Sequence, residues 1–316
     1  MSASSERKIF ARSAPAKLNL MLAVTGTRDD GFHELVSLVA PVPALCDELE
    51  MEICADAAAD SLECVSAESA EDFARGVPVD ASNLILRAAA AFRARVPAFP
   101  HVHFSLKKRI PHGAGLGGGS SDAVAALLLA AEAAGTLFGA GRAAALCGGN
   151  ALLPIAAALG SDCPLFLAGT PLVMRGRGEI TEKLSAAEIA ALAAKKFLIF
   201  KPAFSVSTAE AYSAMKRAAP QFYTPRAEAE RRLAAWRAAP AETPLPLFND
   251  MEAPVFRKFV ALPAVFRVLR ERFGICAHMS GSGSACFAEI SPQTDVPAVS
   301  ACIRECLGAS AFVFCA

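Results

Sequence analysis

The segment IPHGAGLGGGSSDA, residues 110–123, decides how the rest of the chain is interpreted. Five of the seven positions 113–119 are glycine, and a stretch rich in Ala and Leu follows directly. Before it, apolar and polar residues alternate over 101–108, which predicts a strand. The glycine segment is therefore expected to connect a strand to a helix of about 121–134.

This arrangement is typical of a loop that binds phosphate. Glycines let the backbone approach a ligand closely and adopt positive φ angles. The first-turn amides of a helix have no intrahelical partner, and the positive end of the helix dipole adds to their attraction for an anion. We expect Ser120 and Ser121 to cap the helix, or to contact a phosphate or its magnesium ion. Asp122 would repel phosphate unless it is turned aside or shared with a cation.

Two other interpretations of the glycine segment fit less well. Gly113, Gly115 and Gly118 match the dinucleotide-binding fingerprint formally, but that fingerprint needs an acidic residue at the end of the next strand, about 20 residues on. Here Glu132 comes earlier and falls in the expected helix. A Walker A loop would need Gly-Lys-Ser/Thr, which does not follow. A flexible linker is disfavoured because a strand and a helix flank the segment.

The composition limits the classes of protein to consider. The 316 residues include 31 basic and 31 acidic side chains, so the formal net charge is zero. Proteins that coat nucleic acid or anionic membranes need clustered positive charge, whereas a small anion can be held by a few local groups. Hydrophobic residues make up 54% of the chain, which is enough for a substantial core. The length suggests two domains or one large one.

The cysteines and the apolar runs predict a protein of a reducing compartment. The ten cysteines form no CxxC pair, and we interpret them as small buried hydrophobic residues. Residues 1–13 lack the apolar core of a secretory signal. The longest uninterrupted apolar run, 123–131, is far shorter than the roughly 20 residues of a membrane span. We therefore expect a cytoplasmic location and no membrane association.

Strands that alternate irregularly with helices favour an α+β fold over a doubly wound sheet. A strand is expected over 7–25, and within its alternating part, 16–25, Lys17 and Asn19 lie on the face opposite the apolar residues. The other expected elements are helices at 83–95, 140–148, 151–159, 207–217, 253–272 and 294–306, and extended segments at 32–42, 47–54, 164–173, 197–201 and 311–315. The expected domain boundary lies near residue 175.

A second loop rich in glycine and serine lies at 280–284, between two short apolar segments. Alone, such a loop is usually an ordinary turn. Because both glycine-rich loops are flanked by strands, they could converge on one ligand.

Three segments in order resemble the GHMP kinase superfamily: APAKLNL at 14–20, the glycine segment at 110–123, and MSGSG at 279–283. Further matches narrow the resemblance to one subfamily, whose substrate is an alcohol linked to cytidine diphosphate. They are DGFHEL at 30–35, LGSDCPLF at 159–166, GRGE at 176–179, VST at 206–208 and FNDME at 248–252.

The resemblance implies a two-domain fold. An N-terminal domain over 1–175, of the ribosomal-protein-S5-like type, would bind ATP, and a ferredoxin-like C-terminal domain would span 176–316. It also implies a kinase that uses ATP and Mg²⁺, with a small-molecule substrate and with no nucleic acid, membrane or obligate protein partner. The nucleotide-binding residues it implies are Pro111, Gly113, Ala114, Gly115, Leu116, Gly117, Gly118, Gly119, Ser120 and Ser121. Ser121 is the candidate magnesium ligand.

The resemblance makes Asp162 and Lys17 the candidate catalytic residues. A carboxylate at Asp162 would accept the proton of the substrate hydroxyl. Lys17 would donate to the attacking oxygen, or neutralise the charge that develops during the transfer. From the sequence alone, Asp162 could be a turn residue after a helix, and Lys17 could lie on the solvent face of an edge strand.

The candidate substrate-binding residues are Asn19, Phe32, His33, Asp162 and Thr208. Where the subfamily has Tyr-His against the cytosine ring, this chain has Phe32 and His33. Phe preserves ring packing but loses the hydrogen bond of a phenol.

Three alternatives to this subfamily are left open by the sequence. The chain could be a GHMP kinase for another alcohol, such as mevalonate or homoserine. It could be a ligand sensor on the same fold, although a sensor would be expected to lack Asp162 or Lys17. A nicotinamide-dependent dehydrogenase is the weakest alternative.

Overall fold

The structure, a computed structural model, describes residues 8–67, 73–141, 144 and 150–316. These residues form two compact units, each discontinuous in sequence. The first unit holds the described residues up to 16, together with 43–112 and 117–168. The second unit holds 17–42, 113–116 and 169–316. The domain boundary expected near residue 175 falls within strand β5 (Leu172–Gly176) and stays a prediction.

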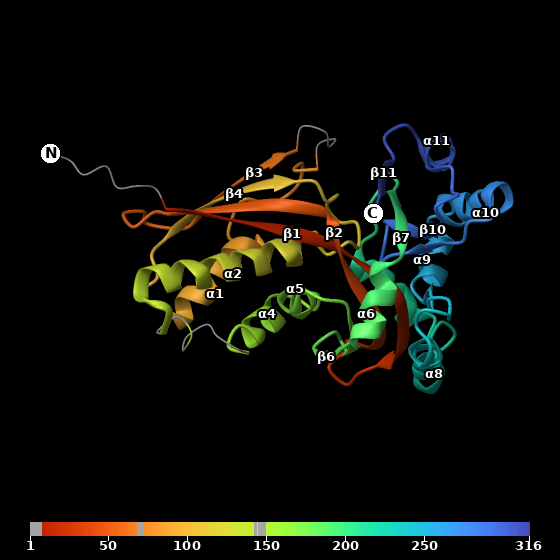
Figure 1. Cartoon of the computed structure of the whole chain (residues 1–316), viewed down its shortest axis with the longest axis horizontal. Coiled ribbons are helices and arrows are strands. Elements are labelled where there is room, and N and C mark those ends of the chain that lie inside the picture. The colour runs from red at the N-terminus through yellow and green to blue at the C-terminus, as the bar shows by residue number, and fades with distance from the viewer. Residues whose placement is uncertain (1–7, 68–72, 142–143, 145–149) are drawn as a thin grey trace. The chain divides into compact units, whose positions relative to one another are not determined.

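The first unit contains a sheet built from long strands (Figure 1). Strands β1 (Ile9–Thr27) and β2 (His33–Ile53) contribute residues to both units. In the first unit, β2 pairs antiparallel with β4 (Val102–Lys108), and β3 (Ser61–Ser66) pairs parallel with the other edge of β4. The alternating side chains of β4 are buried as the sequence predicts.

Four helices of the first unit lie on one side of this sheet (Figure 1). Helix α2 (Gly118–Phe138) packs against α1 (Leu84–Arg95) and against α5 (Cys163–Ala168), and α4 (Leu153–Leu159) packs against α1. Among the described residues, α2 alone has the length and composition of a possible membrane span. Eleven of its residues are buried in the structure, so α2 has the character of a core helix.

The second unit contains an antiparallel sheet in the order β11–β7–β10–β9. Helix α10 (Ala261–Phe273) precedes β9, and α11 (Val296–Leu307) connects β10 to β11. If the four strands are numbered 1 to 4 along the chain, their order across the sheet is 4-1-3-2. This is the βαββαβ arrangement of a ferredoxin-like unit. The strands are β7 (Lys196–Lys201), β9 (Ala277–Met279), β10 (Cys286–Ile290) and β11 (Phe312–Cys315).

The rest of the second unit extends β1 and β2. Strand β5 pairs antiparallel with β2 and with β6 (Ile180–Lys183), and β8 (Phe248–Asn249) pairs parallel with β1. An apolar core that includes Phe200, Leu269 and Met279 underlies its helices. The remaining helices are α6 (Ala186–Ala193), α7 (Thr208–Arg217), α8 (Arg226–Ala238) and α9 (Glu252–Lys258).

The α+β expectation is confirmed, but two local expectations are wrong. Residues 164–173 were expected to be extended, whereas the first part forms α5, where Pro164 near the helix start fits its fixed φ angle. The single helix expected at 253–272 is two helices, α9 and α10. The ring of Pro263 would clash with the carbonyl of residue 259 in a continuous helix, which explains the break. The helix expected at 140–148 lies mostly outside the described residues.

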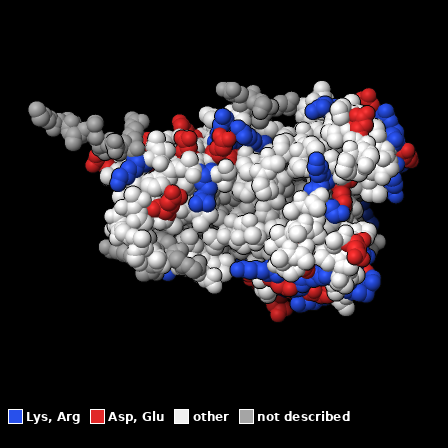
Figure 2. Space-filling model, in the orientation of Figure 1, with Lys and Arg blue, Asp and Glu red and all other residues white. Residues whose placement is uncertain are grey.

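Basic and acidic side chains are interspersed on the face drawn in Figure 2. Among the described residues visible there, neither sign of charge covers a large continuous surface. This pattern agrees with the balanced composition of the chain.

Candidate active site

The glycine-rich loop opens helix α2 through a left-handed residue. Gly117 has φ +73° and is the N-cap of α2, and no side chain caps this helix. The first intrahelical bond runs from the Ser121 amide to the Gly117 carbonyl, at 2.9 Å. The amides of Gly118, Gly119 and Ser120 therefore precede the helical hydrogen bonds and are suited to bind an anion. The capping role considered for Ser120 and Ser121 is wrong, because the helix begins three residues earlier than expected.

Asp122 is turned aside and shared with a cation, as its position requires. Lys108 donates to Asp122 Oδ2 at 2.9 Å and also to Asp47. Asp47 in turn accepts the backbone N–H groups of Arg109 (2.6 Å) and Ile110 (2.9 Å). All three charged side chains are buried. This cluster ties the end of β4 to the start of α2 and so fixes the glycine loop at both ends.

Burial raises the pKa of Asp122 to about 7, and the negative charge of Asp47 adds to the effect while Lys108 opposes it. Burial also lowers the pKa of Lys108, but the two carboxylates outweigh it, so this pKa lies above its ordinary value. Lys108 therefore stays charged, and Asp122 holds its proton more tightly than a free carboxyl group does.

We expect the Asp122→Asn variant to have a different pH dependence of stability from the wild type. The folded-state pKa of Asp122 lies above its unfolded value of 3.8, so the native state binds this proton more tightly. That contribution is fully present below about pH 4 and is lost as the pH rises through about 7. The unfolding free energy of the wild type, minus that of Asp122→Asn, should fall by on the order of 1–3 kcal/mol between pH 4.5 and 8.

Urea unfolding followed by circular dichroism at both pH values measures this difference. Asp60→Asn is the matched control, since Arg93 and the Val102 amide hold the pKa of Asp60 below its ordinary value, against the effect of burial. The contribution of Asp60 is lost only as the pH falls below about 3.8, its unfolded value, so the difference for its variant should be nearly the same at pH 4.5 and pH 8. A pH-independent difference for Asp122→Asn would contradict the assignment.

The segment that carries Asp162 packs on the first turn of α2. Residues 160–162 connect α4 to α5. The Cys163 thiol donates to the Ser120 carbonyl at 3.7 Å, and a Cβ on Gly160 would lie 3.4 Å from Ser120 Oγ. Within the first unit, the structure therefore holds the candidate base in a segment adjacent to the candidate phosphate site.

Lys17 and Asn19 are buried side chains on β1, with exposed fractions of 3% and 7%. Lys17 Nζ donates to the Asn19 side-chain carbonyl, and Asn19 Nδ2 donates to Ser37 Oγ at 3.0 Å. The Asn19 amide N–H also donates to Ser280 Oγ at 3.2 Å. The interpretation of Lys17 as a residue on the solvent face of an edge strand is wrong.

Both glycine loops meet in the second unit. Ser280 Oγ donates to the Gly115 carbonyl at 3.1 Å, and the Ala285 amide donates to the Ala114 carbonyl at 2.9 Å. Gly115 has φ +76°, and a Cβ there would overlap the Ser280 carbonyl oxygen, so only glycine fits. The Lys17 amide donates to the Leu116 carbonyl at 2.9 Å. The loop at 280–284 therefore packs against residues 114 and 115 of the glycine loop and is not an isolated turn.

The predicted nucleotide-binding residues are divided between the units. Gly113, Ala114, Gly115 and Leu116 belong to the second unit, and Pro111 belongs to the first together with residues 117–121. Of the candidate catalytic residues, Asp162 lies in the first unit and Lys17 in the second.

Asn249 supports the second loop, a role that no sequence pattern predicts. Its Nδ2 donates to the carbonyls of Met279 (2.6 Å) and Gly281 (2.8 Å). Glu252 accepts the Met279 amide at 2.8 Å, and Asp250 accepts the Val24 amide at 2.8 Å. The FNDME segment therefore fixes the loop at 280–284 and part of β1.

His33 lies among aromatic rings whose proximity the sequence pattern does not predict. Its ring centroid is 4.9 Å from that of Tyr212, and Tyr223 meets it edge-on at 6.0 Å. These are the only two tyrosines of the chain, and their rarity is the feature of the sequence that could have pointed to them. His33 is buried, and its Nε2 has no hydrogen-bond partner among the described residues. Burial lowers the pKa of His33, with a further contribution from Lys216, so the ring is neutral at pH 7.

Phe32 and Thr208 have different surroundings. Phe32 is 51% exposed, and the Arg177 guanidinium lies 5.1 Å from its ring centroid. The Thr208 hydroxyl forms a 2.7 Å hydrogen bond with Ser282 Oγ. Thr208 therefore ties the start of α7 to the loop at 280–284. Phe32, which precedes His33 in the sequence, has an exposed ring.

Comparison with known proteins identifies the class to which this fold and site belong. A family model described as the GHMP kinases N terminal domain matches residues 83–170, which include the glycine loop and Asp162. A crystal structure of homoserine kinase from Cytophaga hutchinsonii has the same fold, with a TM-score of 0.62 at 16% identity, and covers 100% of this chain and 96% of its own. The chain has the two-domain GHMP kinase fold.

Closer relatives narrow the class to one family. The 4-diphosphocytidyl-2-C-methyl-D-erythritol kinase of Methylacidiphilum infernorum is 35% identical, covering 89% of this chain and 86% of the relative. The protein of the same name from Synechococcus sp. (strain CC9311) is 38% identical, covering 90% and 87%. A crystal structure of 4-(cytidine 5'-diphospho)-2C-methyl-D-erythritol kinase covers 97% of this chain and 98% of its own, with 32% identity and a TM-score of 0.69. The chain belongs to the 4-diphosphocytidyl-2-C-methyl-D-erythritol kinase family.

Proposed function

We propose that this chain transfers the γ-phosphoryl group of ATP to the 2-hydroxyl of 4-diphosphocytidyl-2-C-methyl-D-erythritol, a step of the non-mevalonate isoprenoid precursor pathway. The observation that carries the substrate assignment is the buried, neutral His33, which lies beside two tyrosines and whose Nε2 has no hydrogen-bond partner within the described part of the chain. An aromatic wall with one buried hydrogen-bonding atom suits a pyrimidine base. Mevalonate and homoserine have no such ring.

The residues present fit a bound nucleotide. The amides of 118–120 precede the helical hydrogen bonds, and the buried Ser121 Oγ has no hydrogen-bond partner among the described residues. We assign the ATP phosphates to these groups and to the backbone of 113–117.

Magnesium fits the same place. No group of three His, Cys, Asp or Glu residues within the described ranges is suited to hold a metal ion. Mg²⁺ bound mainly by phosphate oxygens and water needs few protein ligands, and Ser121 Oγ is the candidate. When bound, the ion would neutralise charge on the phosphates.

In the proposed reaction, the 2-hydroxyl oxygen attacks the γ-phosphorus and the bond to the ADP oxygen breaks. The Asp162 carboxylate accepts the hydroxyl proton, and Lys17 stabilises the negative charge on the reacting oxygens. Asn19 orients Lys17 through their hydrogen bond. Little covalent chemistry falls to the protein, so positioning and electrostatics account for the rate.

We assign the cytidine end of the substrate to His33, with Phe32, Tyr212 and Thr208 as further contacts. Neutral His33 can donate or accept at Nε2, depending on its tautomer. Phe32 supplies a ring face without a phenol hydroxyl, so we assign it packing only.

The remaining alternatives are distinguished by the same residues. A sensor would not need both Lys17 and Asp162, and a dehydrogenase of the doubly wound type would need a parallel sheet that this fold lacks in its described part.

We also propose a cytoplasmic location and action without nucleic acid, membrane or an obligate protein partner, supported by the balanced charge of the chain.

ADP release with three alcohols tests the proposed function. We expect kcat/KM for 4-diphosphocytidyl-2-C-methyl-D-erythritol to exceed the values for mevalonate and homoserine by about 10³-fold or more, because an unfilled base site leaves buried polar groups unpaired. His33→Ala should raise KM for the cytidyl substrate, whereas KM for ATP should stay close to the wild-type value. Absence of turnover with the cytidyl compound would remove the proposal.

A further inference from the structure

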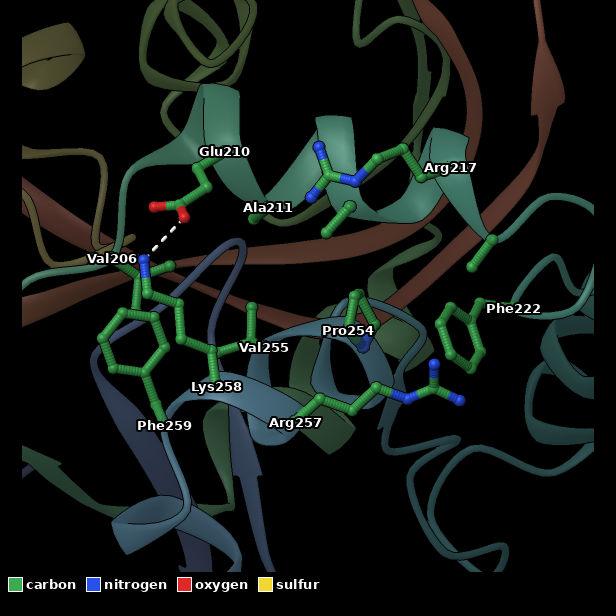
Figure 3. Close-up of a pocket in the computed structure, with 12 residues that line it drawn as sticks. Val206, Glu210, Ala211, Arg217, Phe222, Pro254, Val255, Arg257, Lys258 and Phe259 are labelled. Carbon is green, nitrogen blue, oxygen red and sulfur yellow. Dashed lines mark hydrogen bonds and ion pairs between the residues drawn. The ribbon is translucent and has the colours of Figure 1, made fainter.

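A pocket of about 390 Å³ lies between α7 and α9 of the second unit (Figure 3). Its apolar surface includes Ala211 and Ala214 of α7 and Pro254 and Val255 of α9. Phe222 and Phe259 lie at opposite ends of the view in Figure 3. The volume is that of a site for a small organic molecule.

The pocket is distinct from the proposed substrate site. In an α-helix, residues four positions apart lie on the same face, whereas residues two positions apart point about 200° apart around the axis. Thr208 and Tyr212 therefore lie on one face of α7, where they contact Ser282 and His33. Ala214 and Arg217 are on the other face and line the pocket. The body of α7 separates the two places.

The charges that line the pocket do not balance. Lys258 forms a 2.6 Å ion pair with Glu210 across the pocket (Figure 3). The other charged groups that line the pocket are the guanidinium groups of Arg217 and Arg257. Arg257 lies over the Phe222 ring, 4.5 Å from its centroid. Within the part of the chain that the structure describes, neither arginine has a carboxylate partner. Both are exposed, so a ligand can reach them.

We propose that this pocket binds a small organophosphate with a compact apolar group. The phosphate would lie between Arg217 and Arg257, since guanidinium groups match phosphate oxygens in geometry and two of them balance a charge of about −2. The apolar group would lie on the Ala211, Ala214, Pro254 and Val255 surface. Phe222 already holds one guanidinium in place, which reduces the entropy lost on binding.

Titration of the full-length protein with phenyl phosphate, followed by isothermal titration calorimetry, tests the proposal. We expect saturable binding with a Kd of about 1 mM or tighter for a ligand of this size. Inorganic phosphate lacks the apolar group, and benzyl alcohol lacks the phosphate. Each should therefore bind at least about tenfold more weakly than phenyl phosphate.

Three variants make the test specific. The double variant Arg217→Gln/Arg257→Gln should weaken binding at least about tenfold, because it removes both charged donors. Ala214→Phe should weaken it comparably by filling the apolar surface. Arg267→Gln/Arg270→Gln makes the same change of charge on exposed positions of α10 and should bind like the wild type.

Competition with cytidine 5'-diphosphate separates this pocket from the substrate site. Excess cytidine 5'-diphosphate should leave phenyl phosphate binding unchanged. The proposal is overturned by a lack of saturable binding, by equal affinity of the Arg217→Gln/Arg257→Gln variant, or by displacement with cytidine 5'-diphosphate. None of these outcomes depends on kinase activity, so the proposed function is tested separately.

Discussion

Asp162→Asn is expected to lower kcat by about 10²–10⁴-fold while the affinity for ATP stays within a few-fold of the wild type. The amide has nearly the same shape as the carboxylate but cannot accept the substrate proton. The segment 160–162 is held on the first turn of α2 through Cys163 and Gly160, whose contacts the substitution leaves intact. The loss should therefore fall on turnover rather than on folding.

A second carboxylate of the first unit provides the control for this experiment. Asp60 pairs with Arg93 at 2.6 Å and is also partly buried. Asp60→Asn should lower the unfolding free energy and leave kcat within about threefold, since it breaks an ion pair away from the glycine loop. Steady-state kinetics and ATP titration on both variants separate the roles. Turnover of Asp162→Asn near the wild-type value would remove the assignment of the base.

The local features of the site were predictable because they depend on neighbouring residues. The alternation before the glycine segment and the apolar run after it predicted β4 and α2. The charge of Asp122 predicted that it must be turned aside, although Lys108 and Asp47 could not be named. The partner Asp47 lies 61 residues before Lys108, and sequence spacing carries no information about such a contact.

The parts that could not be predicted depend on tertiary contacts. Asn249 acts through carbonyls at 279 and 281, and Tyr212 acts through the ring of His33, far away in the sequence. The end of α9 before α10 had a local cause in Pro263, which the amphipathic pattern concealed. The start of α2 at Gly118 depends on Gly117 adopting a left-handed conformation, and a run of glycines does not reveal which member does so.

Lys17→Met is expected to lower kcat by about 10²–10³-fold, the typical loss when one preorganised donor to a reacting oxygen is removed. Methionine has a similar length, so the buried stem of Lys17 should still pack on β1. Neighbouring side chains hold the ammonium group of Lys17 in position. Asn19 donates through Nδ2 to Ser37, so its carbonyl must face Lys17. Ser37 Oγ is itself held at 2.6 Å by the Met21 carbonyl.

Lys17→Arg should not restore activity, which distinguishes a positioned donor from a general need for positive charge. A Cβ on Gly281 would lie 3.2 Å from Lys17 Nζ and 3.1 Å from Asn19 Oδ1, so the space around the ammonium is limited. A planar guanidinium is larger and places its donors differently. Lys196→Met, on an exposed position of β7, is the control and should leave kcat unchanged. Lys17→Met removes the ammonium donor and nothing else. If it kept kcat within threefold of the wild type, the catalytic role of Lys17 would be wrong.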